Sequence, residues 1–250
     1  MEQWHGKIAV VTGSSAGIGA AIAIHLTNAG MVVVGLARRT ERTLALKEQI
    51  FANLRNNLHA MQCDVSKESD IVVAFKNIEE TFGGVDVLVN NAGVVRDTRL
   101  IDPNNSLPIR ETWETNVMGL VMCSREAYQS MKRRSVAGHI ININSIVGHS
   151  LPYSVEALIS SYNMYAPSKH AVTAITEVTR QELLNDKSKV KVTSISPGAV
   201  KTEILELTEV QFPLLNAEDI AQAVLYVLST PPHVQVCKEP NYEIGMYTLL

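Results

Sequence analysis

A glycine-rich turn near the amino terminus constrains the fold of this 250-residue chain more than any other feature of its sequence. Residues 12–19 read TGSSAGIG, after the β-branched apolar run Ile8-Val11 and before an alanine-rich stretch of helical period. Because glycine has no Cβ, it permits a tight turn and a close approach of the backbone to another group. The pattern predicts a buried strand, a tight turn and a helix in direct succession.

The same alternation of short apolar runs and longer helical segments continues along the chain. Runs bounded by Gly, Asn, Asp or Ser, as buried strands are, occupy residues 8–11, 32–37, 59–63, 87–89, 140–144 and 190–195. We expect one helix with Ser66 as its N-cap, ending at Gly83-Gly84, and a long helix from Glu111 to Arg134. Right-handed crossovers then favour a doubly wound parallel sheet in three α/β/α layers, a Rossmann fold, with residues 1–250 as one domain.

Composition excludes several classes of function. With 22 basic and 25 acidic side chains, the net charge of -3 gives no electrostatic footprint for nucleic acid or an anionic membrane. The cysteines Cys63, Cys123 and Cys237 form no CxxC pair, and the histidines do not cluster at zinc-ligand spacing. The amino terminus lacks a signal-peptide pattern, and no apolar run is long enough for a membrane span. We therefore predict a cytoplasmic protein with a small-molecule partner, no bound metal and no membrane span.

The glycine turn also predicts a ligand. A glycine-rich turn between a strand and a helix brings backbone N–H groups and the positive end of the helix to a pyrophosphate. The segment expected to hold that pyrophosphate comprises Gly13, Ser14, Ser15, Ala16, Gly17, Ile18 and Gly19. The alternative is an ordinary tight turn between a strand and a helix.

The end of the second apolar run distinguishes between the two nicotinamide dinucleotides. An acidic residue at this place would bind the ribose 2′-hydroxyl of NAD, but the chain has Arg38 and Arg39. Two guanidiniums suit the 2′-phosphate of NADP, although they could also simply solvate the start of a helix. Asp64, followed by Val65, is placed to accept a hydrogen bond from the adenine amino group or to act as a turn residue.

A phenol and an ammonium group are spaced for joint chemistry at Tyr165 and Lys169. Four residues apart on a helix, they share one face, and a nearby cation favours the phenolate of a tyrosine, whose free pKa is about 10. The neighbouring Tyr153 and Tyr162 have alanine at the fourth residue and lack this cation. Tyr165 is therefore the expected acid or base, the alternative being a surface pair on an amphipathic helix.

Two polar residues are expected beside that pair. Ser145 ends the fifth predicted strand at the carboxyl edge of the sheet, where it could donate to a substrate oxygen or cap the next turn. Asn116 is a poor helix former inside a predicted helix. Its carbonyl or amide is expected to anchor a water that links Lys169 to solvent, although alone it is more often a solvated residue.

The ordered set of motifs resembles the shorter subtype of the short-chain dehydrogenase/reductase family. These motifs are the TGxxxGxG turn, Asn90-Asn91-Ala92-Gly93, Asn116, Ser145, Tyr165, Lys169 and Pro197-Gly198, and the resemblance runs from Lys7 to about Ser229. It implies a catalytic tetrad of Asn116, Ser145, Tyr165 and Lys169. It also implies NADP contacts from Asn91 near the adenosine, Ala92, Gly93, Tyr165, Lys169, Pro197 and Gly198, with Val200 and Thr202 at the nicotinamide amide.

Finer features, including GHIININS at 138–145, resemble the branch of the family that holds insect farnesol dehydrogenases and a vertebrate keto-steroid reductase. The expected substrate walls, within 149–163 and 203–216, are apolar and lack Arg and Lys between 151 and 159 and between 204 and 215. This composition favours a lipophilic alcohol such as farnesol, or its aldehyde or ketone, unless these side chains complete a core or a subunit interface. A carbonyl or keto-steroid reductase and a non-catalytic NADP-binding sensor remain alternatives. We expect a homodimer or homotetramer.

Overall fold

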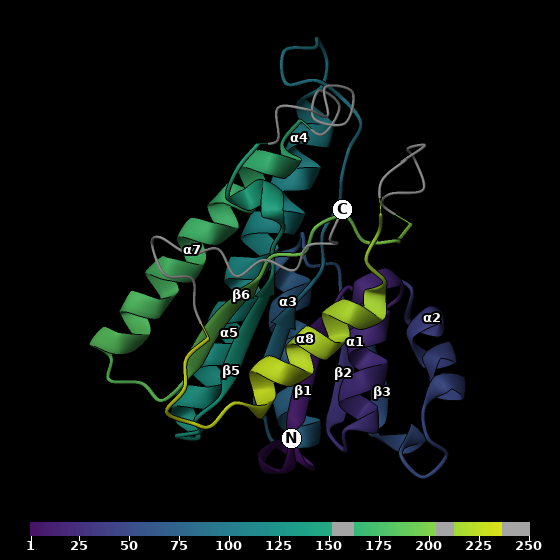
Figure 1. Ribbon diagram of the computed structural model, residues 1–250, viewed down its shortest axis with the longest axis vertical. Helices are drawn as coiled ribbons and strands as arrows, with labels where there is room; N and C mark the ends of the chain where they lie inside the picture. Colours follow the sequence, from purple (N-terminus) through teal and green to yellow (C-terminus); the bar gives the residue numbers. More distant parts are fainter. Residues whose placement is uncertain (152–162, 204–212, 237–250) are drawn as a thin grey trace.

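Six parallel strands form one central sheet in the computed structural model, which describes residues 1–151, 163–203 and 213–236 (Figure 1). The strands lie in the order β3-β2-β1-β4-β5-β6. Their bounds are β1 Ile8–Thr12, β2 Val32–Ala37, β3 Leu58–Gln62, β4 Val87–Asn90, β5 His139–Ile143 and β6 Lys191–Ile195. The six predicted strands are confirmed, with bounds that differ by one residue at most ends.

The order of the strands reverses beside β1. The chain moves outward from β1 through β2 to β3, and then returns to place β4 on the other side of β1. In register, Val10 lies beside Val34 of β2 and Leu88 of β4. Because all strands are parallel, their carboxyl ends meet at one edge, and a crevice opens where the order reverses. The fold therefore predicts a ligand site between the ends of β1 and β4.

Helices cover both faces of the sheet. Their bounds are α1 Gly17–Asn28, α2 Thr40–Ala45, α3 Glu68–Phe82, α4 Ser106–Trp113, α5 Gly119–Arg133, α7 Tyr165–Asn185 and α8 Ala217–Ser229. Short turns add η1 Glu2–Trp4, η2 Leu46–Gln49, η3 Arg55–Asn57, η4 Glu114–Met118 and η5 Ile146–Gly148. Across the described ranges, none of these helices has both the length and the apolar character that a membrane crossing requires.

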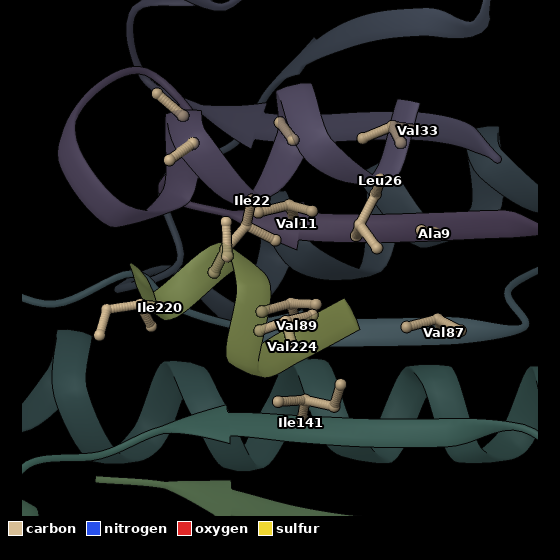
Figure 2. Close-up of a cluster of buried hydrophobic side chains, with 14 of the residues drawn as sticks. Ala9, Val11, Ile22, Leu26, Val33, Val87, Val89, Ile141, Ile220 and Val224 are labelled. Atoms are coloured by element: carbon tan, nitrogen blue, oxygen red, sulfur yellow. The ribbon is translucent and has the colours of Figure 1, made fainter. Parts of the chain in front are cut away.

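Two hydrophobic cores lie on opposite faces of the sheet, because successive side chains of a strand point to opposite sides. Ala9 and Val11 of β1 join the core beneath α1 and α8, whereas Ile8 and Val10 join the core beneath α3 and α5. Figure 2 shows the first core, where side chains of α1 and α8 pack on the strands; those labelled are Ala9, Val11, Ile22, Leu26, Val33, Val87, Val89, Ile141, Ile220 and Val224.

The start of α3 differs from the prediction. Ser66 is not its N-cap: Lys67 holds that position, and the hydroxyl of Ser66 donates to the Asp64 carboxylate at 2.7 Å. The predicted end is correct, since Gly83 closes the helix with a φ of 82°, a conformation that side chains with a Cβ disfavour.

The long helix predicted from Glu111 to Arg134 is also divided. It begins earlier, as α4 at Ser106, and continues into α5 through η4, a π-helical turn at Glu114–Met118. A π turn takes one more residue per hydrogen-bonded ring than an α-helix, and such turns are frequent at functional sites. Asn116 lies in the middle of this turn.

A buried carboxylate ties the amino-terminal end of the sheet to α5. Asp86, 3% exposed, accepts from the Ile8 N–H at 2.9 Å through Oδ2 and from Arg134 Nη1 at 2.9 Å through Oδ1. Loss of this carboxylate leaves the buried Ile8 N–H without its acceptor and the half-buried guanidinium of Arg134 without its counter-charge, with only the Val85 carbonyl still accepting from it.

We therefore predict that Asp86→Ala lowers the free energy of unfolding by about 3 kcal/mol, because removing one partner of a buried ion pair strands the other. Urea unfolding followed by circular dichroism measures this loss. The matched control is Asp186→Ala, which removes an exposed ion pair with Lys132 and should cost less than about 1 kcal/mol. Equal losses in the two variants would contradict this role of Asp86.

Candidate active site

A cavity of about 370 Å³ opens at the predicted edge of the sheet. Its lining comes from the glycine turn, from the ends of β2 and β3, from the segment after β4, and from β5, α7 and the segment after β6. Among the predicted site residues the lining includes Gly13, Ser15, Ala16, Gly17, Ile18, Arg38, Arg39, Asp64, Val65, Asn91, Ala92, Gly93, Tyr165, Lys169 and Thr202. One cavity therefore joins the predicted cofactor residues to the predicted Tyr-Lys pair.

Other predicted residues lie behind this surface. The lining in the described part of the chain does not include Ser14, Gly19, Asn116, Ser145, Pro197, Gly198 or Val200. Ser14 is fully buried and its hydroxyl pairs with that of Thr43 at 2.9 Å, while Val200 packs its side chain into the core beneath α1. The substrate walls predicted within 149–163 and 203–216 fall largely on residues 152–162 and 204–212, which lie outside the described residues.

The glycine turn is pressed against the segment after β4. A Cβ on Gly19 would stand 2.4 Å from the Gly13 carbonyl oxygen, and one on Gly13 would stand 2.9 Å from Ala92 Cα. Asn91 Nδ2 donates to the carbonyls of Thr12 and Gly13 at 3.0 and 3.3 Å. Because backbone fills the space where a Cβ would stand, these glycines allow the two segments to meet. The turn thus has the close-packed form that a pyrophosphate-binding turn requires.

Two arginines line the cavity just after the end of β2. Arg38 and Arg39 are both exposed, and the lining also includes the acidic residues Asp64 and Glu203. Burial favours a higher pKa for Asp64, but hydrogen bonds from the side chain and backbone of Ser66, together with the charges of Arg38 and Lys67, lower the pKa of that carboxyl. Asp64 therefore acts as a turn residue, one of its two predicted roles; adenine recognition stays a prediction.

Tyr165 and Lys169 meet at the amino-terminal end of α7. The helix begins at Tyr165, and Pro167 falls in its first turn, where a missing N–H costs nothing. Lys169 Nζ lies 5.6 Å from the centroid of the Tyr165 ring and donates to the Ile143 carbonyl at 2.9 Å. The helix dipole and the ammonium group both favour negative charge on the phenol.

The ammonium group of Lys169 is deeply buried, with the residue 7% exposed. Burial disfavours its charge and lowers its pKa from 10.5 to about 8. At neutral pH the charged form still predominates, so Lys169 remains a cation beside Tyr165.

Asn116 connects the segment after β4 to α7. Its Oδ1 accepts from the Val94 N–H at 2.8 Å, and its Nδ2 donates to the Val94 carbonyl at 3.0 Å and to Ser168 Oγ at 3.1 Å. These bonds use both Nδ2 protons and one lone pair of Oδ1, and the predicted link from Asn116 through water to Lys169 stays a prediction. Asn116 thus holds the two segments that carry the site side by side.

Ser145 caps the short turn η5 through its hydroxyl oxygen, which accepts from the Val147 N–H at 3.3 Å. This bond uses a lone pair and leaves the hydroxyl proton to be donated. Both predicted properties of Ser145, as a capping residue and as a potential donor, are therefore compatible.

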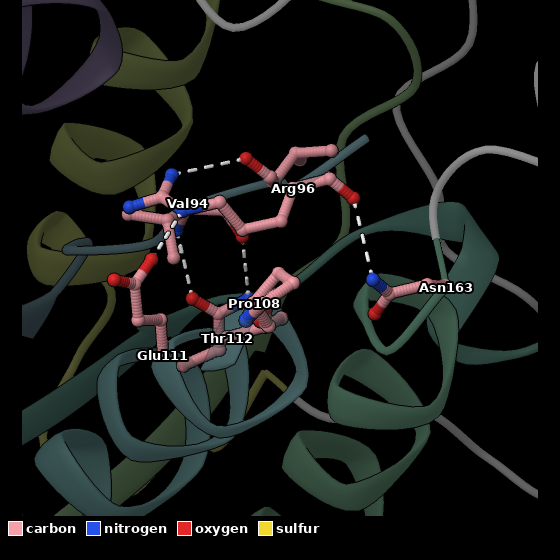
Figure 3. Close-up of polar contacts among 8 residues, drawn as sticks. Val94, Arg96, Pro108, Glu111, Thr112 and Asn163 are labelled. Atoms are coloured by element: carbon pink, nitrogen blue, oxygen red, sulfur yellow. Dashed lines mark hydrogen bonds and ion pairs between the residues drawn. The ribbon is translucent and has the colours of Figure 1, made fainter. Parts of the chain in front are cut away.

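Sequence analysis missed an ion pair in the cavity wall. Arg96 Nε donates to Glu111 Oε2 at 2.6 Å, and Asn163, two residues before Tyr165, approaches the Arg96 carbonyl at 3.5 Å (Figure 3). Both members of the pair line the cavity. One indication in the sequence that Arg96 lies in the cavity wall was its position, because Arg96 follows Gly93 of the NNAG motif by three residues. No periodicity, however, links it to Glu111.

The parallel sheet with its reversal of strand order, the glycine turn and the Tyr165–Lys169 pair define a Rossmann-fold oxidoreductase. The chain belongs to the family described as short chain dehydrogenase, whose sequence pattern matches residues 7–211.

Named relatives agree with this assignment. The chain is 59% identical over 241 residues to a farnesol dehydrogenase of Aedes aegypti, covering 94% of this chain and 95% of that one. It is 42% identical over 253 residues to dehydrogenase/reductase SDR family member 11 of Mus musculus, covering 94% of each. Among solved structures, the closed form of a serine dehydrogenase complexed with NADP+ superposes with a TM-score of 0.79 at 29% identity, covering 97% of this chain and 99% of that one.

We predict that Lys169→Met stabilises the protein below pH 8, because it removes a cation that burial disfavours. The lowered pKa means that, between about pH 8 and 10.5, the unfolded state binds more protons than the folded state, so wild-type stability rises with pH there. The advantage of the variant should be on the order of 3 kcal/mol below pH 8 and shrink towards pH 10. Urea unfolding across this range measures the difference, and a difference independent of pH would contradict the assignment.

Proposed function

We propose that this protein transfers a hydride between NADP(H) and a lipophilic alcohol or its aldehyde or ketone, with Tyr165 as acid and base. The observation that carries the proposal is the buried ammonium group of Lys169 at 5.6 Å from the Tyr165 ring, in a cavity that also contains Arg38 and Arg39. A protein that only bound the dinucleotide would need the arginines but not the activated phenol. The Tyr-Lys pair therefore favours an enzyme over an NADP-binding sensor.

The chain offers matching groups for each part of NADP. The donors Arg38 and Arg39 suit the 2′-phosphate, and the close-packed turn at Gly13, Gly17 and Gly19 suits the pyrophosphate. Solved relatives support this choice, since a serine dehydrogenase was solved in complex with NADP+ and an archaeal alcohol dehydrogenase from Thermococcus sibiricus in complex with 5-hydroxy-NADP. When bound, NADP(H) supplies the centre that accepts or donates the hydride.

The protein side of the reaction is proton transfer. In the oxidation direction the Tyr165 phenolate takes the alcohol proton at Oη as hydride leaves the carbinol carbon; in reduction, the neutral phenol returns a proton to the carbonyl oxygen. Lys169 and the amino terminus of α7 stabilise the phenolate, and the Ser145 hydroxyl donates to the reacting oxygen. The carbonyl or amide of Asn116 holds a water that connects Lys169 with solvent.

The described part of the substrate end favours an uncharged ligand. Its one described ion pair joins Arg96 Nε to Glu111 Oε2 at 2.6 Å. The two charges neutralise each other, so neither is left to bind an ionic substrate. The relative named farnesol dehydrogenase supports farnesol or a similar isoprenoid alcohol as the substrate class. Reduction of a ketone, including a keto-steroid, is the same chemistry in reverse. Turnover measured with NADP+ and isoprenoid alcohols, and with NADPH and ketones, separates these possibilities.

We also infer a homodimer or homotetramer in the cytoplasm. The buried free thiols of Cys63 and Cys123 suit a reducing compartment, because burial keeps both thiol pKa values high and the groups inert. Light scattering after size-exclusion chromatography tests the assembly, and fractionation of cells tests the compartment.

We predict that Tyr165→Phe lowers kcat by at least about 10²-fold, the range typical of a general acid or base, and leaves NADP affinity nearly unchanged. The substitution keeps the ring and its packing. Single-turnover kinetics and cofactor titration measure the two effects. A variant with near-normal turnover and an unchanged pH profile would show that another group moves the proton.

We predict that Arg38→Ala with Arg39→Ala weakens NADP+ binding while affecting NAD+ far less. The loss should be about 1.5–3 kcal/mol for each charged hydrogen bond removed. Calorimetric titration with both dinucleotides gives the measurement. If wild-type protein bound NADP+ and NAD+ equally well, the cofactor assignment would be wrong.

A further inference from the structure

An acidic residue in the segment after β6, distant in sequence, contacts the arginines that follow β2. Glu203, which follows Thr202 in the segment after β6, accepts a hydrogen bond from Arg42 Nη1 of α2 at 2.9 Å. Its other carboxylate oxygen lies 3.6 Å from Arg39 Nη2. Glu203 and Arg39 both line the cavity. One carboxylate therefore bridges Arg39, in the cavity lining, and Arg42, which the lining does not include.

The two arginines could bind a phosphate, and the Glu203 carboxylate occupies the place that such a phosphate would take. Guanidinium groups bind carboxylates and phosphates through the same charge-assisted hydrogen bonds. Both sides of the bridge are open to solvent, since the Arg39 and Arg42 side chains are each 46% exposed and that of Glu203 is 56% exposed. Exposed ion pairs are weak, so a phosphate, which can carry two charges, can replace the carboxylate.

Arg42 was not among the residues predicted from sequence. It lies one helical turn beyond Arg38 and Arg39, which were expected to contact the 2′-phosphate, and nothing in its spacing marks it out. Its shared contact with Glu203 is what brings it beside Arg39.

We propose that Glu203 competes with the 2′-phosphate of NADP for Arg39 and Arg42, and that Arg42 is a further specificity-determining residue for that phosphate. The proposal rests on the proposed function, because it presumes NADP as the cofactor. Glu203 then lowers the affinity for NADP without lowering that for NAD, and it sets how strongly the protein prefers one over the other. An exchange of anions on the two arginines would also leave no guanidinium unpaired in either state.

Binding of two small fragments tests this without turnover. Adenosine 2′,5′-bisphosphate contains the 2′-phosphate, and 5′-AMP lacks it. Calorimetry on wild-type protein and on Glu203→Gln should show that the variant binds the bisphosphate roughly two- to fivefold more tightly, the factor that an exposed ion pair corresponds to. Its affinity for 5′-AMP should stay unchanged. NADP+ and NAD+ should repeat this pattern.

Two further variants distinguish the specific contact between Arg42 and Glu203 from a general effect of removing negative charge. Arg42→Gln should weaken binding of the bisphosphate but not of 5′-AMP, and the gain from Glu203→Gln should shrink in the Arg42→Gln background, because the two residues share one interaction. Glu41→Gln is the matched control: it removes an acid from the same helix that forms no ion pair within the described part of the chain. It should leave the preference between the fragments unchanged.

The outcomes distinguish the two proposals. If the wild-type protein does not prefer the bisphosphate to 5′-AMP, the assignment of NADP fails and this inference falls with it. If it does prefer the bisphosphate, but Glu203→Gln binds it no more tightly or Glu41→Gln gives the same gain, only the competition by Glu203 is overturned.

Discussion

The contact on which the rest of the site depends is the close approach between the turn after β1 and the segment after β4. Thr12 Oγ1 accepts from the N–H groups of both Asn91 and Ala92 at 3.0 Å, while the Asn91 amide returns bonds to the carbonyls of Thr12 and Gly13. A Cβ at Gly13 would meet the backbone of Ala92, and one at Gly19 would meet the Gly13 carbonyl and the Asn91 amide. The reversal of strand order places β1 and β4 side by side. The contact between the turn after β1 and the segment after β4 therefore fixes this part of the cavity wall. The cofactor end and the catalytic end are both built outward from it.

Electrostatics and burial oppose each other at the catalytic end. Lys169 must be close to Tyr165 to favour its phenolate, but the same position removes its ammonium group from water and lowers its pKa to about 8. The Ile143 carbonyl partly compensates by accepting a hydrogen bond. The chain thus tolerates a destabilising charge at the place where the proposed chemistry requires it, as functional sites commonly do.

Local patterns predicted the fold well because the strands are short, buried and rich in β-branched residues. Few other segments of the sequence could form such strands. The same reasoning placed the glycine turn, the Tyr-Lys pair and the arginines on one cavity. It failed at two local details and at contacts between segments that are distant in the sequence. Ser66 looks like an N-cap, but its hydroxyl bonds to Asp64, two residues earlier; the helix around Asn116 looks continuous, but contains a π turn. Arg96 with Glu111, and Glu203 with Arg42, pair across distances that no local period encodes.

The π turn at Glu114–Met118 makes the site sensitive to the number of residues in this helix. An α-helix turns by about 100° per residue, so the extra residue of the π turn sets the rotation of α4 relative to α5. Deleting a single residue there would leave two good α-helices, yet it would rotate Asn116 away from Val94 and Ser168. The length of this helix, and not only the identity of Asn116, is therefore part of the site. A one-residue deletion that keeps the helical secondary structure intact would therefore still separate the segment after β4 from α7.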